Sequence, residues 1–235
     1  MKTKIVTQRP KVKTKKSAPV LNSYVVEYAD SYLVFTGILN VSANTKTGAM
    51  IQTFILDKAR LTSEPRVFGA KCEACPLVDV CYVSREKLAV RSAVKRLVEG
   101  ESTAYAFAEL GEVLPLLNGR AVRFGSYGDP SAIPLSDVER IASAAQEWTG
   151  YTHFWRTIPE GYAAYFMASV ESVEGELDAW TAGYRPYRVI LEGAEPVVTE
   201  EMIECPHYTR GVQCVTCGLC KGTASKAKGI YVFQH

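Results

Sequence analysis

Hydrophobic and polar positions change their period along the chain and divide it into two parts. Residues 23–28 and 32–36 are short runs rich in β-branched and aromatic side chains, a pattern that predicts a β-hairpin. Residues 44–48 have the composition of a turn, and residues 50–56 predict a further strand. We therefore expect an amino-terminal β layer.

A helical pattern follows in residues 84–99, where apolar side chains recur at spacings of three and four. Ser84 is the expected N-cap of this helix, and Gly100 is its expected end. A second helix is expected to begin within residues 101–109.

Beyond Gly119 the predicted strands and helices alternate, which implies right-handed crossovers and a parallel sheet. The strands are too few for a closed eight-stranded barrel, which typically needs ~250 residues. The sequence therefore predicts an α/β fold with a partial (β/α) barrel-like parallel sheet. The expected strands are residues 121–125, 151–155, 163–170 and 187–191, and the expected helices are residues 137–148, capped by Ser136, and 174–182.

Composition places the chain among globular proteins. It has 235 residues, of which 47% are hydrophobic and 22% charged, a balance that excludes coiled coil and collagen. No apolar run approaches the ~20 residues that span a bilayer, and the start lacks the apolar region of a secretory signal. We expect a cytoplasmic protein with no membrane partner.

Positive charge is concentrated at the amino terminus. Seven of the 27 basic residues lie within residues 1–16, and the first acidic residue is Glu27. Residues 1–20 are expected to form a disordered basic arm, with nucleic acid as its alternative partner through counterion release. Residues 21–200 are expected to form the α/β core, and residues 201–235 a separate cysteine-rich segment.

The seven cysteines fall into two groups, which favours metal binding. Seven thiols cannot all pair, and nothing marks the chain for export, so a disulfide framework is disfavoured. The carboxyl-terminal group combines a Cys-Pro with a C-x2-C-x2-C triplet, elements of a bacterial ferredoxin run, although zinc also binds four thiolates. A 4Fe-4S cluster or a zinc ion is expected on Cys205, Cys214, Cys217 and Cys220.

The first group, Cys72, Cys75 and Cys81, has the spacing C-x2-C-x5-C and no fourth cysteine nearby. Three thiolates leave one coordination position of a metal free for another ligand. Three interpretations stay open: zinc completed by His153 or His207, a 4Fe-4S cluster with one open iron, or three buried thiols.

Polar and glycine residues follow the ends of the predicted parallel strands, where ligands bind in such sheets. Each also has a structural explanation: a turn, a packed histidine or a surface salt bridge. The candidates are Gly125, Tyr127, Gly128 and Asp129 after the first strand, His153 and Trp155 on the second with Arg156 at its exit, Ser169 and Glu171 at the third, and Arg185 and Arg188 at the fourth.

Several segments together resemble an uncharacterised, largely bacteriophage-encoded family that is similar to radical S-adenosylmethionine proteins. The resemblance covers most of residues 40–222. The segments are Ser42-Ala-Asn-Thr-Lys-Thr-Gly48, the cysteine run ending in Cys81-Tyr82, Arg123-Phe-Gly-Ser-Tyr-Gly-Asp-Pro130, Thr149-Gly-Tyr-Thr-His153, Met167-Ala-Ser-Val-Glu-Ser172 and the terminal Cys-Pro with its triplet.

This resemblance implies a 4Fe-4S cluster on the first cysteine group, whose open iron would bind S-adenosylmethionine, and an auxiliary cluster or zinc on the second. Radical enzymes usually have C-x3-C-x2-C, and the spacing here is also similar to part of an auxiliary-cluster module. Gly125, Gly128, Asp129, Ser169, Glu171 and Arg188 are the expected cofactor-binding residues, and Tyr127, His153 and Arg156 the expected catalytic ones. The host cytoplasm is the implied location.

The expected activity is hydrogen abstraction from an unknown small-molecule or macromolecular substrate. One alternative is a non-catalytic, zinc-stapled phage protein that binds nucleic acid through the basic arm. Another is hydrolysis at a three-cysteine zinc site with Asp129 or His153 as the base.

Overall fold

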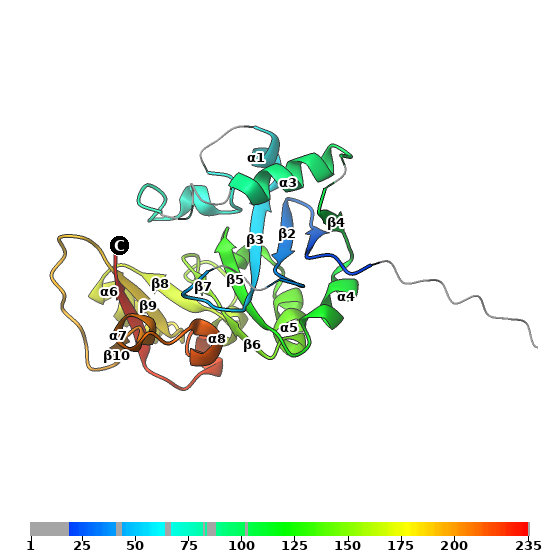
Figure 1. Ribbon diagram of the computed structural model, residues 1–235. Helices are drawn as coiled ribbons and strands as arrows, with labels where there is room; N and C mark the ends of the chain where they lie inside the picture. The colour runs from blue at the N-terminus through cyan, green and yellow to red at the C-terminus, as the bar shows by residue number, and fades with distance from the viewer. Residues whose placement is uncertain are drawn as a thin grey trace, which may run out of the picture.

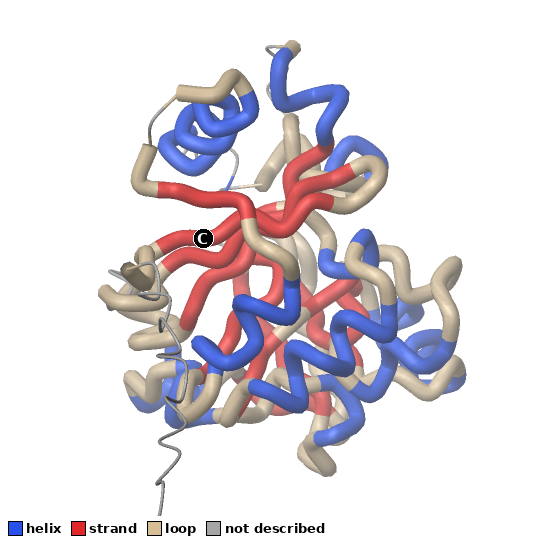
Figure 2. The backbone as a smooth tube through the Cα atoms, turned by 90° about the vertical axis from the view of Figure 1, so that its right-hand side faces the viewer, coloured by secondary structure: helices blue, strands red, loops and turns tan. Residues whose placement is uncertain are grey.

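The computed structural model of the chain shows an α/β protein with two sheets (Figure 1). It describes residues 19–40, 44–63, 67–81, 83, 88–101 and 103–234. Residues 1–18 of the expected basic arm, and the expected N-cap Ser84, lie outside the described residues. Strands run through the middle of the molecule, and the helices lie around them (Figure 2).

The first sheet is mixed and has six strands in the order β4-β1-β2-β3-β5-β6. Its antiparallel pairs are β1 with β2 and β2 with β3, which confirms the expected hairpin and the strand after it. The strands are β1 (Ser23–Glu27), β2 (Ser31–Thr36), β3 (Ile51–Asp57), β4 (Tyr105–Phe107), β5 (Ala121–Tyr127) and β6 (Glu147–Thr149).

The second sheet is entirely parallel and has five strands in the order β10-β11-β9-β8-β7. Its existence confirms the parallel sheet expected from the alternation of strands and helices. Its two carboxyl-terminal strands were not expected. The strands are β7 (Tyr151–Thr152), β8 (Met167–Val170), β9 (Pro186–Ile190), β10 (Met202–Glu204) and β11 (Gly229–Phe233).

Short helices connect these strands. The α-helices are α1 (Lys58–Thr62), α3 (Leu88–Val98), α4 (Leu110–Val113), α5 (Leu135–Ala144), α6 (Val173–Thr181), α7 (Pro206–Arg210) and α8 (Cys214–Cys217). The 3-10 helices are η1 (Cys72–Ala74), η2 (Leu114–Leu117), η3 (Pro130–Ala132), η4 (Glu160–Ala164) and η5 (Gly222–Ala224).

Three expectations about individual elements were wrong. Residues 105–107 form the edge strand β4 rather than a helix, because they hydrogen-bond in parallel to β1. Helix α5 begins at Leu135 with Pro134 as its N-cap, two residues ahead of the start at Asp137 that was expected after Ser136, and it ends at Ala144 rather than at Trp148. Residues 160–164 form η4, so β8 starts only at Met167.

Both faces of the six-stranded sheet are buried. On one face Leu33 and Ile55 pack against residues of α4 and α5, including Ile141. On the other face Val34 and Leu56 pack against α3, which lies above the sheet in Figure 1. Helices on both faces of a sheet are typical of α/β folds.

The two sheets adjoin at Gly150, which separates β6 from β7. A Cβ at this position would lie 2.5 Å from the Phe166 ring, so a residue with a side chain does not fit there. The N–H of Met167 donates to the Gly150 carbonyl, so the pairing of β7 with β8 in the second sheet extends back to Gly150. The strands of the described residues do not close into a barrel.

The buried tyrosine Tyr184 predicts a pH dependence. Burial raises the pKa of Tyr184 to about 12 from its ordinary value near 10, and the nearby Glu160 adds to the rise. Between these values the unfolded chain binds fewer protons than the folded one, so stability falls as the pH increases.

We therefore expect Tyr184→Phe to give a shallower loss of unfolding free energy from pH 10 to 12, measured by urea denaturation. The variant should differ from the wild type by less than about 1 kcal/mol at pH 8, because the hydroxyl is 3.5 Å from its acceptor, the Pro159 carbonyl. Parallel curves for the two proteins would contradict the assignment.

No helix among the described residues is long and apolar enough to span a membrane.

Candidate functional site

A cavity of about 230 Å³ lies where the two sheets adjoin. Successive parallel strands contribute alternate side chains to its wall, including Arg123 from β5, Thr149 from β6, and Tyr187 and Val189 from β9. Alternate residues of a strand point to the same face, so the cavity occupies one face of the adjoining sheets. Residues after the carboxyl ends of these strands complete its wall.

The glycine loop, residues 125–129, enters the cavity at the end of β5. Here β3 advances from Gln52 to Phe54 while β5 advances from Arg123 to Tyr127, so β5 bulges out of the ladder. The Thr53 hydroxyl forms hydrogen bonds to the backbone of the bulge: it donates to the Arg123 carbonyl and accepts from the Gly125 N–H. Bulges of this kind re-aim the backbone next to functional sites.

Gly128 brings the backbone of this loop against β3. Its φ of +83° favours glycine, and a Cβ would lie 2.1 Å from the Ile55 carbonyl oxygen. The N–H of Asp129 donates to the carbonyl of Ala70, which ties the glycine loop to the chain that carries the first cysteines. The sequence indicated two glycines at a strand end, and the structure supplies a reason for both, since Gly125 has a φ of +65° and a Cβ there would lie 2.9 Å from the Gly128 carbonyl oxygen.

Asp129 is buried, and its carboxylate accepts three hydrogen bonds from the protein. Oδ1 accepts from the Ser131 N–H at 2.9 Å and the Thr152 hydroxyl at 2.8 Å, and Oδ2 accepts from the His153 N–H at 3.0 Å. Asp129 therefore fixes the end of β7 against the end of β5. One acceptor position on Oδ2 is left for a ligand, since each carboxylate oxygen can accept two bonds.

Cys72, Cys75 and Cys81 all border this cavity. They lie in the first cysteine loop, residues 69–81, whose backbone turns through η1. Burial raises the pKa of the Cys72 thiol to about 12, the backbone of Gly128 opposes the rise, and Cys75 and Cys81 are near enough to add to it. The loop and the glycine loop thus face each other directly.

His153 and Ser169 also border the cavity, as expected from the sequence. His153 Nε2 lies 3.4 Å from Glu171 Oε1, and Glu171 itself is not part of the cavity wall. Burial opposes protonation, but contacts with Cys75 and Glu171 raise the pKa of His153 to about 10. Tyr127 contributes to the wall, although its hydroxyl accepts a hydrogen bond from the Phe68 N–H.

The structure does not bring Arg156 or Arg188 to the cavity. Arg156 is half exposed, pairs with Asp178 at 2.9 Å and stacks on Trp155. Arg188 is buried and pairs with Glu176 of α6 at 2.9 Å. Arg188 alternates along β9 with residues that face the cavity, so its side chain points to the opposite face of the sheet.

The second cysteine segment, residues 205–220, forms a separate small cavity of about 10 Å³ next to the first. All four of its cysteines line this cavity, and Cys214 borders both cavities. Burial raises the pKa of Cys220 to about 12; the nearby hydroxyl of Tyr151 opposes the rise, and the other three thiols add to it. The four sulfurs are therefore close enough to influence one another.

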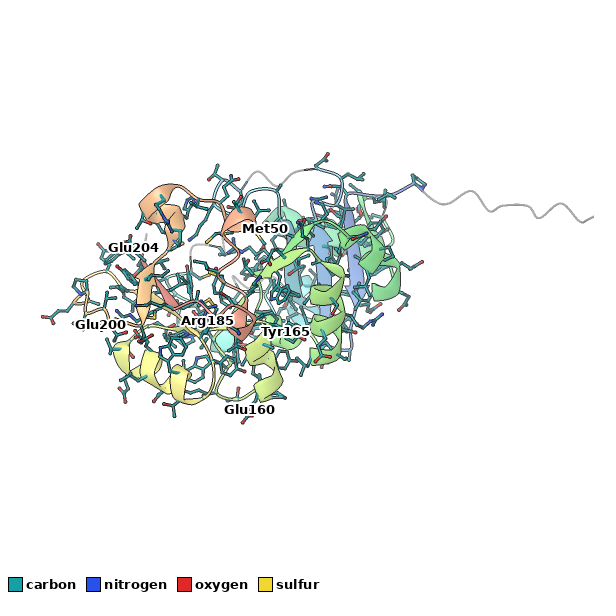
Figure 3. All side chains as sticks on the ribbon, turned by 90° about the horizontal axis from the view of Figure 1, so that it is seen from below. Met50, Glu160, Tyr165, Arg185, Glu200 and Glu204 are labelled. Carbon is teal, nitrogen blue, oxygen red and sulfur yellow. The ribbon has the colours of Figure 1, made fainter. Side chains whose placement is uncertain are left out.

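A buried arginine lies beside the second cysteine segment. Arg185 is 3% exposed, and its guanidinium donates to the carbonyls of Leu219, Gly222, Ala227 and Lys228. Burial lowers the pKa of Arg185, and the nearby Cys220 opposes that shift. In Figure 3 Arg185 lies between the strands and the orange carboxyl-terminal segment. The sequence placed Arg185 among ligand-binding candidates, and the structure shows it holding this segment.

The turn at residues 44–48 docks on the second cysteine segment, a contact that the sequence did not indicate. The N–H groups of Cys214 and Val215 donate to the carbonyls of Lys46 and Thr47 at 2.9 and 3.2 Å. At Gly48, with φ +68°, a Cβ would lie 2.7 Å from the Gln213 amide oxygen. This docking places Lys46 at the wall of the large cavity.

The donor chemistry at both places suits a thiolate-bound metal, because all seven cysteines are free and each group gathers around one cavity. Among the described residues, however, no three Cys, His, Asp or Glu side chains are arranged as a ready-made metal site. Metal binding at either group is therefore a proposal. Comparisons with protein families, with characterised proteins and with solved structures found no match to this chain.

Proposed function

We propose that this protein is an iron–sulfur protein of the radical S-adenosylmethionine type. The observation that supports this most strongly is the placement of Cys72, Cys75 and Cys81 around one cavity, opposite the glycine loop, at the carboxyl ends of parallel strands. Ligand sites in α/β proteins occupy this end of the sheet.

The path of the strands supports a partial barrel. In spatial order β3, β5, β6 and then β7, β8, β9 and β11 are parallel neighbours, and only Gly150 separates β6 from β7. We interpret this series as one curved layer whose concave face holds the cavity.

In this proposal Cys72, Cys75 and Cys81 would hold a 4Fe-4S cluster, which supplies one-electron reduction to a bound sulfonium. Gly125 and Gly128 shape the loop that borders the cavity, and Asp129 Oδ2 would accept a hydrogen bond from the amino group of the ligand. His153 is the acid–base candidate of the cavity, since Arg156 and Arg188 point elsewhere. The substrate would enter beside Ser169.

Cys205, Cys214, Cys217 and Cys220 would bind a second metal centre. The cavity between them, about 10 Å³, has room for one water-sized sphere, which favours a single zinc ion over a second cluster. The buried guanidinium of Arg185, next to Cys220, suits the net negative charge of four thiolates on one divalent ion.

Reconstitution under anaerobic conditions tests the proposal. The full-length protein, supplied with ferrous iron and sulfide, should retain about four irons and turn brown, and should retain zinc at the second group. With S-adenosylmethionine and a strong reductant it should release 5'-deoxyadenosine.

The two cysteine groups serve as controls for each other. The variant Cys72→Ser, Cys75→Ser, Cys81→Ser should lose the iron and keep the zinc, and the corresponding serine variant of the second group should do the reverse. A wild-type protein that binds no iron would overturn the iron–sulfur assignment, and a loaded protein that yields no 5'-deoxyadenosine would overturn the radical activity.

A further inference from the structure

Two cations border the large cavity at the end away from the first cysteine loop. Arg123 precedes the glycine loop by two residues on β5 and pairs across the sheet with Thr149. Lys46 reaches the same end from the turn that precedes β3. Both lie close to the thiol of Cys214: burial raises its pKa, and Arg123 and Lys46 each oppose the rise.

Carboxylates are few in the wall of this cavity. Asp129 is the only carboxylate among the described residues of the wall, and its oxygens already accept three hydrogen bonds from the protein. Lys46 Nζ donates to the phenol oxygen of Tyr208 at 3.1 Å, a contact with an uncharged group.

The remaining wall is largely apolar. Val189, Leu191 and Val232 extend from the middle of the cavity toward the first cysteine loop, which adds Leu77 and Val80. A pocket that is apolar along its length and cationic at one end orients a ligand with an apolar body and an anionic head. A volume of about 230 Å³ limits that ligand to a small molecule.

We propose that Lys46 and Arg123 bind the oxyanion group, a carboxylate or a phosphate, of a small amphipathic ligand whose apolar part lies against Val189, Leu191 and Val232. In terms of the proposed function this ligand is the substrate, held with its apolar part toward Cys72, Cys75 and Cys81. The binding itself does not require a metal at those cysteines. Arginine suits this role because its planar guanidinium can bind carboxylate or phosphate with two parallel hydrogen bonds.

Calorimetric titration of the full-length protein with hexanoate, hexyl phosphate and 1-hexanol tests this inference. One of the two anions should bind at least tenfold more tightly than the alcohol, and the comparison between them identifies the head group. Arg123→Met and Lys46→Met should each weaken anion binding about tenfold and leave the weak binding of hexanol unchanged. The control variants Arg140→Met and Lys58→Met, which remove surface cations paired with Asp137 and Glu27, should bind like the wild type.

Equal affinity for the anions and the alcohol would overturn the inference. So would unchanged anion affinity in Arg123→Met together with loss of metal from the second cysteine group, since the cations would then serve that centre. The same titration of the serine variant of Cys72, Cys75 and Cys81 separates the two proposals. If anion binding that depends on Arg123 is found in this serine variant, and the wild type takes up no iron, this inference stands and the proposed function fails.

Discussion

Gly128→Ala is expected to destabilise the protein by about 3 kcal/mol or more and to displace the glycine loop from β3. The new Cβ would lie 2.1 Å from the carbonyl oxygen of Ile55, an atom of a central strand that cannot move without breaking the sheet. The backbone φ of +83° adds its own cost for any residue with a Cβ. Urea denaturation monitored by circular dichroism measures the loss.

Gly183→Ala is the matched control for this substitution. Gly183 has nearly the same φ, +78°, but an added Cβ would meet nothing within 4 Å. Its replacement should therefore cost only the roughly 1–2 kcal/mol of a left-handed backbone. If the two variants lost equal stability, the close approach between Gly128 and β3 would not exist as the structure shows it.

The displacement of the loop should also affect the cavity. The backbone of Gly128 is close enough to lower the pKa of the Cys72 thiol, and the N–H of Asp129 donates to the Ala70 carbonyl. Both contacts depend on the position that Gly128 holds. Gly128→Ala should therefore lower the iron retained by the first cysteine group after reconstitution, while Gly183→Ala retains the wild-type amount.

Strands with a strong local signal were predictable from the sequence. The runs at residues 24–28, 32–36 and 121–125 are rich in β-branched and aromatic side chains, and each forms a strand close to its expected bounds. Strands β10 and β11 were not predicted because they lie beyond the alternating region and are formed by pairing with distant partners, β11 with β9 and β10 with β11. The short strand β4 was mistaken for a helix because its state is decided by pairing with β1, a partner far away in the sequence.

Some residues of the cavity could be predicted from the sequence, and others could not. Gly125, Gly128 and Asp129 stand at a strand end, so the fold rule located them. The prediction for Arg188 was wrong because that rule locates strand ends but does not say toward which face of the sheet a neighbouring side chain points. Lys46 escaped because the turn at residues 44–48 reaches the cavity only through its docking on Cys214 and Val215. Such docking has no local sequence signal.

Arg185→Met should be the most damaging single change in the carboxyl-terminal part, costing about 3–5 kcal/mol of unfolding free energy. Methionine keeps most of the length of the side chain but donates no hydrogen bond, so the carbonyls of Leu219, Gly222, Ala227 and Lys228 lose a buried donor. A buried acceptor left without its partner costs about 1–3 kcal/mol. Arg185→Lys should recover only part of the loss, because an ammonium group has three N–H donors for four carbonyls.

The loss should be local before it is global. The Arg185 guanidinium binds four carbonyls of residues 219–228, so the amide hydrogens of this segment should exchange faster in Arg185→Met than in Arg140→Met, a surface control. Amides of β2 and β3, in the other sheet, should exchange at similar rates in both variants. Because the anchor acts through carbonyl groups rather than through thiols, the effect should be present both with and without zinc. If added zinc restored wild-type exchange to Arg185→Met, the metal rather than Arg185 would be what fastens this segment.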